Sequence, residues 1–543
     1  MGAAMLVSLR AGPLDEAFLK VPTGDLHRGY GICLFDAKGE IWSRYEGWAN
    51  EERGLAFSRD TVFRVGAVSD LFTVMLALRF LDPERPIGAY LPELFAGAGP
   101  GTPLGRVGSL KVGTLMSHLS GTDATFFLGY QDYDPFTNLG AYLKDVNLKY
   151  PPETKVLRSG AMIDLLGLAL VRASGKGFDQ LARTEVFEPL GMKASSFRFQ
   201  DSPLFATMRY KSAAPDTYAT RIPGFRDVVA PSGSMQSSIR DLAAGFAALL
   251  RAPGAPGAPP FSPGVLKAMF ASRNEAVAQR QGLRVGCGWY LSLPDLAYLG
   301  NLAWYAGKHM SHRNVVILLP GLGIGVVCAT NAWSIFDRET ILPMAVAVIK
   351  AYAQASLNLT EAPARLERMD MPPQLKALVG GLYVSSFGIY RVQVEGAGIR
   401  VGSDAMDILL DYGGQGVFHP GPGGPLRQIG FHPPDSLTLF LRNGMVIDAQ
   451  RSRPDPDAGQ WLERQGTYRI AQAAPGALYA FSLGSAEGLP VISGDDGIEL
   501  PLEARAPDRA AILCDESSRF FGKELRVAGD RELRLDGVLY RRM

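Results

Sequence analysis

The stretch FRVGAVSDLFT, residues Phe63–Thr73, decides how the first part of this chain is interpreted. Apolar residues recur at helical spacing from Val68 onward, which predicts a helix over about residues 69–80. Ala67 and Asp70 are three positions apart, so we expect them to lie one turn apart on the same face. The helix start thus combines a methyl group and a carboxylate.

The first 356 residues predict an α+β domain with strands at both ends and helices between them. Residues 31–49 form two alternating runs joined at Lys38 and Gly39, the pattern of a hairpin. Residues 314–332 form two further strands around a turn that contains Gly and Pro. Helices are also predicted over about residues 160–173, 237–252 and 342–355.

The rest of the chain has a different sequence pattern, which predicts short alternating strands separated by Gly and Asp-Gly turns. This pattern is typical of small antiparallel barrels or sandwiches. A charged segment with prolines precedes the strands, and a second one, at residues 451–461, divides them. We therefore predict a first domain over residues 1–356 and two small β-barrel domains over 357–460 and 461–543.

The composition is that of an ordinary globular protein, with 47% hydrophobic and 20% charged residues in 543. The 55 basic side chains almost balance the 54 acidic ones, and no long basic run occurs. Nothing here indicates a nucleic-acid or membrane partner. The first residues resemble neither a secretory signal nor a membrane helix, so we expect a cytoplasmic protein.

Four cysteines are widely spaced, which predicts buried free thiols rather than a disulfide framework; they are Cys33, Cys287, Cys328 and Cys514. The six histidines form no evident metal-ligand cluster. His309 and His312 lie three residues apart beside a turn, and we expect neither a metal nor a cofactor.

Several segments resemble, in one order, the serine β-lactamase/penicillin-binding-protein family. The nucleophile helix of that family is similar to TVFRVGAVSDLFT, and its His-x-Ser-Gly helix to LKVGTLMSHLSGT. The other matching segments are residues 87–94, 151–192 and 305–331. The family resemblance implies a β-lactamase/transpeptidase-like domain.

Because two β units follow the β-lactamase/transpeptidase-like domain, the whole chain resembles the D-stereospecific aminopeptidases of that family. These enzymes cleave an N-terminal D-residue through an acyl-serine. The resemblance also implies that a loop of the last barrel reaches the active site, and its counterpart here is VISGDDGIE, residues Val491–Glu499.

The residues that perform chemistry in that family are replaced here. The resemblance places the family's serine at Ala67 and its lysine at Asp70. Its tyrosine falls at Arg158 and the polar residue paired with it at Gly160. The third motif, Lys- or His-x-Gly, falls on Tyr305-Ala306-Gly307.

These replacements exclude ordinary acyl-serine chemistry. The methyl group of Ala67 can neither attack a carbonyl nor lose a proton. Ser69 lies two residues on, roughly 200° around the helix axis, and points to the wrong face. Asp70 and Arg158 read as a paired exchange, because a guanidinium can hold a carboxylate through two N–H donors.

Backbone N–H groups remain available as donors when a side chain is replaced. The resemblance implies an oxyanion hole made by the N–H groups of Ala67 and Lys308, where a carbonyl or carboxylate could dock. The candidate ligand-binding residues are Ala67, Arg158, Tyr305, Gly307 and Lys308. His118 and Ser120 follow the family pattern, in which we expect them to cap and pack a helix. Trp289, Tyr298 and Trp304 are candidates for lining the cleft, although core packing is the usual fate of such rings.

Three functions remain open at this point. The first is a pseudoenzyme or partner subunit that binds a small amide, peptide or carboxylate in the old cleft. The second is an active enzyme with Asp70 as general base, Tyr305 as acid and Arg158 as anion anchor. The third is a structural protein that uses the β units for interaction. Candidate partners are a second copy of the chain or a partner enzyme.

Overall fold

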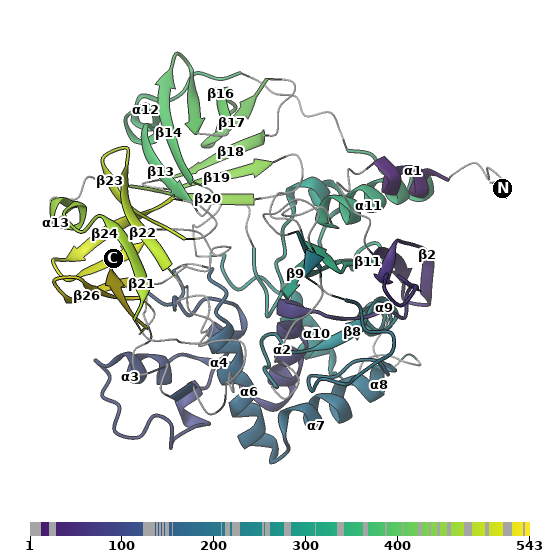
Figure 1. Ribbon diagram of the computed structural model, residues 1–543. Helices are drawn as coiled ribbons and strands as arrows, with labels where there is room; N and C mark the ends of the chain where they lie inside the picture. Colours follow the sequence, from purple (N-terminus) through teal and green to yellow (C-terminus); the bar gives the residue numbers. More distant parts are fainter. Residues whose placement is uncertain are drawn as a thin grey trace.

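In the computed structural model, the chain folds into a sheet-and-helix domain followed by two barrels (Figure 1). The structure describes residues 12–20 and 29–543 except 123–135, 137–138, 141–142, 144–145, 147–150, 155, 208, 212–217, 220–228, 252–254, 256–260, 276–283, 310, 334–340, 362–367, 386–387, 404–405, 422–425, 434–435, 442–445, 453–457, 472–479, 495–498, 514–523 and 536–537.

The first domain is built on a five-stranded antiparallel sheet in the order β2-β1-β11-β10-β9. The hairpin near the start of the chain therefore pairs with strands almost 300 residues later, since Tyr30 lies opposite Thr330. The strands are β1 (Tyr30–Asp36), β2 (Gly39–Glu46), β9 (Ala303–His309), β10 (His312–Leu319) and β11 (Ile324–Thr330).

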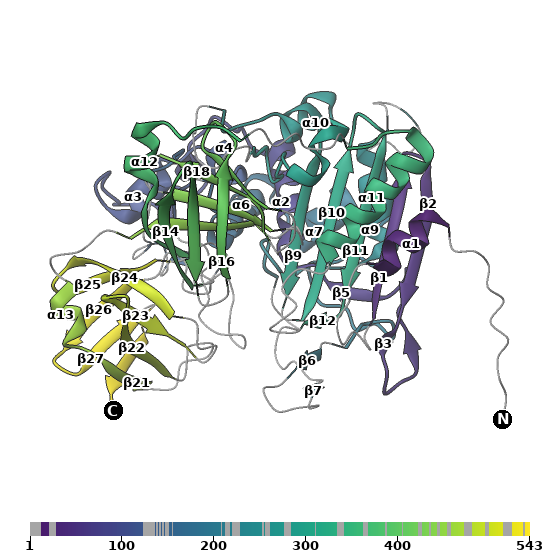
Figure 2. The ribbon, with the colours of Figure 1, turned by 90° about the horizontal axis from the view of Figure 1, so that it is seen from above.

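Helices cover both faces of this sheet because side chains alternate between its two sides. On one face Ile32, Leu34 and Ile317 pack in a cluster with α11 (Ile341–Leu357) and α1 (Pro13–Lys20), which Figure 2 shows side by side. On the other face, neighbouring strand residues join a larger cluster with α2 (Ser69–Phe80), α6 (Gly160–Ser174) and α9 (Ile239–Leu249).

The remaining helical pieces of this domain are short. They are α3 (Pro103–Gly108), α4 (Val112–Met116), α7 (Phe178–Ala182), α8 (Glu188–Leu190) and α10 (Pro263–Phe270), with a π-helical turn (Arg183–Phe187) and 3-10 turns η1 (Gly66–Val68), η2 (Ile87–Ala89) and η4 (Pro294–Leu299). The short strands are β3 (Trp48–Asn50), β4 (Leu55–Ala56), β5 (Val62–Arg64), β6 (Arg209–Lys211), β7 (Tyr218–Ala219), β8 (Gln236–Ser238) and β12 (Ala332–Trp333).

Each of the last two units is a closed antiparallel barrel in which every strand pairs with the next and the last pairs with the first. The first barrel contains β13 (Gly381–Ser385), β14 (Gly388–Glu395), β15 (Gly398–Ser403), β16 (Met406–Tyr412), β17 (Val417–Pro420), β18 (Leu426–His432), β19 (Ser436–Leu441) and β20 (Val446–Arg451), preceded by α12 (Pro373–Val379). The second contains β21 (Gly466–Ile470), β22 (Ala480–Ala486), β23 (Leu489–Ser493), β24 (Glu499–Ala506), β25 (Arg509–Ile512), β26 (Glu524–Gly529), β27 (Glu532–Leu535) and β28 (Val538–Arg542), preceded by α13 (Ala458–Leu462).

The predicted α+β class with two following β-barrels is confirmed. Both barrels lie next to each other, on the side of the first domain away from the N terminus (Figures 1 and 2). Arg391 of β14 forms an ion pair with Glu487 of the second barrel. Among the described residues, no helix is both long and apolar enough to cross a membrane.

The cysteines follow the expectation as far as they are described. Cys33, Cys287 and Cys328 are buried free thiols, and Cys514 lies outside the described residues. Within the described part of the chain, no three His, Cys, Asp or Glu residues are grouped so that they could hold a metal ion. His309 and His312 face each other at the end of the β9–β10 pair.

Candidate functional site

The start of α2 lies directly against β9, and two glycines permit this contact. Gly66 has φ +54°, and a Cβ atom there would lie 2.2 Å from the carbonyl oxygen of Lys308. A Cβ atom at Gly307 would lie 1.9 Å from the carbonyl oxygen of Val65. Any larger residue would push the strand away. The backbone of Lys308 is thereby held beside the turn that carries Ala67, which is half-buried.

Asp70, in the first turn of α2, is held by Arg158. The Nε atom of Arg158 donates to Oδ2 of Asp70 at 2.7 Å, and Nη2 donates to Oδ1 at 2.9 Å. The same Nη2 donates to the carbonyl oxygen of Ser232 at 2.8 Å. The Asp70 side chain is fully buried, whereas that of Arg158 remains 23% exposed. The structure thus contains a bidentate ion pair in which only the arginine side chain is partly exposed to solvent.

Tyr305, on β9, joins the same carboxylate. Its hydroxyl donates to Oδ2 of Asp70 at 2.9 Å and lies 3.0 Å from Nε2 of His118. A phenol has one proton, so the oxygen of Tyr305 must accept the proton on Nε2 of His118. The rings of His118 and Tyr305 are also stacked, with centroids 5.8 Å apart. Hydrogen bonds therefore run from His118 through Tyr305 to Asp70.

Burial and neighbouring charges shift the pKa values of His118, Tyr305 and Arg158. It lowers the pKa of His118 to about 3, and the positive charge of Arg158 acts in the same direction. Burial, and next the charge of Asp70, raises the pKa of Tyr305 well above its usual value. Burial acts against the charge of Arg158, but Asp70 outweighs it and the pKa of Arg158 is raised. Burial also raises the pKa of Asp70, although the charge and hydrogen bonds of Arg158 and the hydroxyl of Tyr305 oppose this effect. At neutral pH, His118 and Tyr305 are therefore neutral, beside a carboxylate that the two N–H donors of Arg158 keep ionised.

Sequence reasoning missed two aromatic members of this site. His118, expected only to cap and pack, follows α4 with φ +57° and bonds to Tyr305 through its side chain. Tyr290, half-buried, stacks on Tyr305 with ring centroids 5.4 Å apart. The segment around Tyr290 carries no motif, so only the tertiary contact identifies it. Ser120 instead pairs with Thr122, their hydroxyl oxygens being 2.9 Å apart.

The other candidates lie elsewhere. Ser69 is fully buried, and its hydroxyl accepts from the N–H of Met235 at 3.3 Å. Trp289 belongs to the core, where it packs against Phe246. Tyr298 packs against the cluster on the opposite face of the sheet. Trp304 is half-buried beside Tyr290. Gly160 begins α6 next to Arg158.

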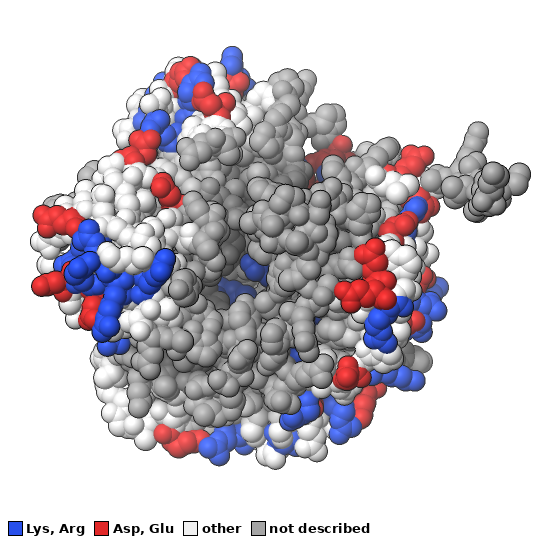
Figure 3. Space-filling model, in the orientation of Figure 1, with Lys and Arg blue, Asp and Glu red and all other residues white. Residues whose placement is uncertain are grey.

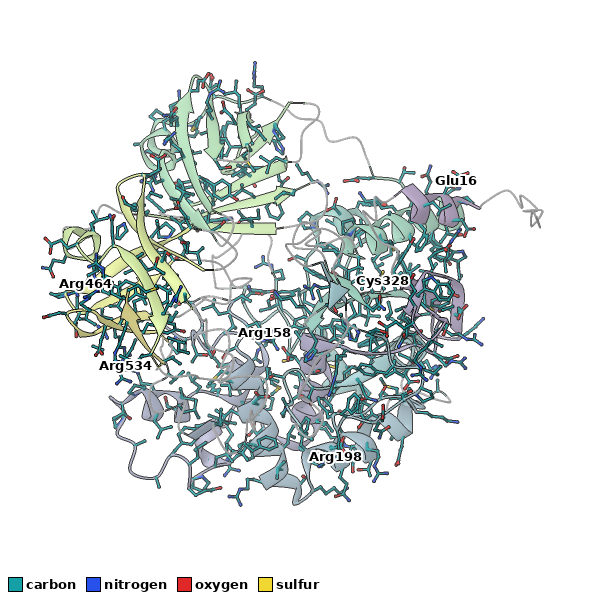
Figure 4. All side chains as sticks on the ribbon, in the orientation of Figure 1. Glu16, Arg158, Arg198, Cys328, Arg464 and Arg534 are labelled. Carbon is teal, nitrogen blue, oxygen red and sulfur yellow. The ribbon has the colours of Figure 1, made fainter. Side chains whose placement is uncertain are left out.

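Basic side chains lie at the bottom of a hollow near the centre of the molecule, where Arg158 is found (Figures 3 and 4). Lys308 is exposed on β9. The predicted loop of the last barrel, residues 491–499, spans the end of β23 and the start of β24, and its residues 495–498 lie outside the described residues.

Similar proteins point to one family. The family model described as Beta-lactamase matches residues 22–349. The chain is 23% identical over 348 residues to unguisins hydrolase ungD' of Aspergillus campestris, covering 59% of this chain and 62% of that protein. It therefore spans less than two thirds of that relative's length.

Two solved structures share the fold. A β-lactamase/D-alanine carboxypeptidase from Pseudomonas syringae superposes with a TM-score of 0.50 at 18% identity, over 63% of this chain and 98% of that one. SurE, crystallised with D-Leu, superposes with a TM-score of 0.53 at 16% identity, over 81% and 97%. Since the family model matches more than half of the 543 residues, this chain belongs to the β-lactamase family.

Proposed function

We propose that this chain is a pseudoenzyme of the β-lactamase family that binds a small carboxylate-bearing peptide or amide in the family cleft without forming an acyl-serine. The observation that carries the proposal is the state of Asp70, which is fully buried with both oxygens occupied by Arg158 and Tyr305. A carboxylate that is shut off from solvent and already accepts three hydrogen bonds is not within reach of a nucleophile or a water, and Ala67 supplies no nucleophile.

Positive groups and backbone donors around Ala67 favour an anion. The N–H groups in the first turn of a helix have no carbonyl partner within the helix and carry a partial positive charge. Ala67 lies in that turn, at the start of the continuous helical stretch from Gly66 to Phe80. Lys308 is exposed on the strand beside it. The Nη1 donors of Arg158 take no part in the bonds to Asp70 and Ser232.

An enzyme that uses Asp70 as base and Tyr305 as acid fits this geometry less well. The two side chains are in direct contact at 2.9 Å and are 0% and 1% exposed, so no substrate atom fits between them. The proton of Tyr305 already points at Asp70. A site that retains only backbone donors keeps a small remnant of catalysis, roughly 10³–10⁴ over water in the protease precedent.

The names of similar proteins suggest the ligand's chemistry. One structural neighbour was crystallised with D-Leu, and another is a β-lactamase/D-alanine carboxypeptidase. Both names involve a D-amino acid, which carries a free carboxylate. We therefore propose ligands that end in a D-residue with its carboxylate free.

Isothermal titration calorimetry with N-acetyl-D-leucine and its neutral amide tests the proposal. We expect binding of the acid and at least about tenfold weaker binding of the amide, since tenfold corresponds to the loss of one modest charge-assisted contact. Lys308→Met should weaken binding of the acid, whereas Lys376→Met, on exposed α12 of the first barrel, should not. Equal binding of acid and amide, or hydrolysis of the amide detected by mass spectrometry, would contradict the proposal.

A further inference from the structure

One leucine of the first domain belongs to the core of the second barrel. Leu157 is 4% exposed, and it clusters with barrel residues that include Trp461, Tyr468, Phe481 and Tyr540. No other residue before position 461 belongs to that cluster of described residues. The second barrel therefore packs onto the first domain through Leu157, a side chain of the first domain that forms part of the barrel's apolar core.

The residues on either side of Leu157 make their contacts within the first domain. Val156 is 6% exposed and packs with Leu119 and Val285, away from the barrel cluster. The N–H of Leu157 donates to the carbonyl oxygen of His118 at 2.6 Å. The side chains of the consecutive residues Val156 and Leu157 thus pack in two different clusters. Val156 packs within the first domain, and Leu157, which directly precedes Arg158, packs into the second barrel.

The next residue is Arg158, whose guanidinium holds Asp70. The backbone that presents this side chain is thus connected to the barrel by Leu157 and to the hydrogen-bond chain by His118. A guanidinium needs its backbone in a narrow range of positions to keep two bonds to one carboxylate. Loss of either attachment gives the segment freedom to move.

We infer that Leu157 is a positioning residue through which the second barrel holds Arg158 in the site. This inference rests on the proposed function for its consequence in ligand binding, but its structural part does not. The second barrel accordingly contributes to the geometry of the proposed binding site by holding the segment that presents Arg158. Release of Leu157 from the barrel loosens the segment and exposes Arg158 without removing any group that contacts the ligand.

Chemical modification of arginine by phenylglyoxal, followed by peptide mass spectrometry, measures this exposure in the full-length chain. In Leu157→Ala we expect the rate at Arg158 to rise about tenfold, because truncation of a buried leucine is a large perturbation. Arg64, 2% exposed in the first domain, is the internal reference for global unfolding and should react at the unchanged rate. Leu157→Met, which keeps the volume, should restore the wild-type rate at Arg158.

Val156→Ala is the matched control because it truncates the adjacent buried residue on the side of the first domain. It should leave the rate at Arg158 near the wild-type value. Equal rates at Arg158 in wild type and Leu157→Ala, or an equal increase in both alanine variants, would overturn the inference. If Leu157→Ala does not fold, Leu157→Val provides the smaller truncation, with the same ordering of rates expected against Val156→Ala.

Ligand binding separates this inference from the proposed function. The modification rates need no ligand, so they stand even if N-acetyl-D-leucine does not bind. If it does bind, Leu157→Ala should weaken its affinity while Val156→Ala should not. Faster modification of Arg158 with unchanged affinity would refute the role of Leu157 in binding, and the proposed anion site would then have to rely on Lys308 and Ala67.

Discussion

Arg158 holds both carboxylate oxygens of Asp70, although the two residues lie 88 positions apart in the chain. Asp70 lies in the first turn of the buried helix α2, whereas Arg158 lies two residues before the start of α6. Because Asp70 is inaccessible to solvent, its charge depends on this one guanidinium and on Tyr305. The pair is therefore a structural element of the domain.

Replacement of Asp70 by Asn should destabilise the protein strongly. Removal of one partner from a buried ion pair typically costs about 3–5 kcal/mol, and the partial exposure of Arg158 favours the lower end, about 3 kcal/mol. Urea unfolding measures the change in the free energy of unfolding. Asp201→Asn, at an exposed position, is the control and should change it little. The double variant Asp70→Leu/Arg158→Leu should lose less than Asp70→Asn, and an equal or larger loss would contradict a penalty caused by the unpaired guanidinium.

Stability should fall in mild acid because of the buried histidines. The pKa of His118 is about 3 in the folded protein against an ordinary value of 6.5, so the unfolded chain takes up a proton first as pH falls. Stability from this group is thus fully present above about pH 6.5 and is lost as pH falls towards 3, with a slope of about 1.4 kcal/mol per pH unit. His309, whose pKa is lowered to about 3 by burial and nearby arginines, contributes in the same direction.

The contribution of His118 can be isolated by comparing wild type with His118→Gln between pH 6 and 4. The variant loses the hydrogen bond to Tyr305, so its stability is lower throughout, but the informative quantity is the slope. We expect the slope against pH to be shallower by about 1.4 kcal/mol per pH unit, since all other titrating groups are shared. Parallel curves would show that His118 is protonated in the folded state.

Ala67→Ser should not restore acyl-serine chemistry. The new hydroxyl would stand at the start of α2, but the carboxylate of Asp70 already accepts three hydrogen bonds from Arg158 and Tyr305, and Nε2 of His118 is bonded to Tyr305. Neither group is an effective base for this proton, because Asp70 is held by Arg158 and burial lowers the pKa of His118 to about 3. We expect no labelling of the variant by a fluorophosphonate or a penicillin probe in intact-mass spectra, as for wild type. Labelling of the introduced hydroxyl at position 67, located by peptide mapping, would prove that a base is available.

The contact between β9 and the helix start should tolerate no added methyl group. In Gly307→Ala the Cβ atom would lie 1.9 Å from the carbonyl oxygen of Val65, well inside van der Waals contact, so the strand or the turn must move. We expect a loss of several kcal/mol, of the order of about 3, in thermal or urea unfolding. Gly321→Ala, with nothing within 4 Å of its Cβ position, should be nearly neutral. Similar stability in both variants would show that this close approach is absent in solution.

Local patterns in the sequence predicted much of the fold. Helical spacing after Val68 placed the helix that is observed as α2, and the helix expected over residues 237–252 is observed as α9. The Gly-rich segment after β10 is a turn between antiparallel strands, as its flanking apolar runs indicated. Alternation alone could not distinguish a sandwich from a barrel. That choice depends on pairing between the first and last strands, which no local pattern records.

The ion pair of the site was predictable because the replacement at position 70 explained the one at position 158. The simultaneous replacements at positions 70 and 158 suggested the ion pair because their charges are complementary. Tyr290, the side-chain role of His118 and the barrel contact of Leu157 were not predicted. Each of these depends on contacts with another segment or domain that is distant in the chain, and none carries a charge partner or motif that a single sequence could reveal.

Each barrel closes on itself, with its opening strand hydrogen-bonded to its final one, so the chain enters and leaves at neighbouring points. A unit of this kind can be spliced in or out of a gene with little rearrangement of what surrounds it. For the second barrel, excision would leave Leu157 uncovered, and a transplanted replacement would have to bring a cavity of matching shape. The modularity of the architecture is therefore limited by an aliphatic side chain that belongs to a different domain.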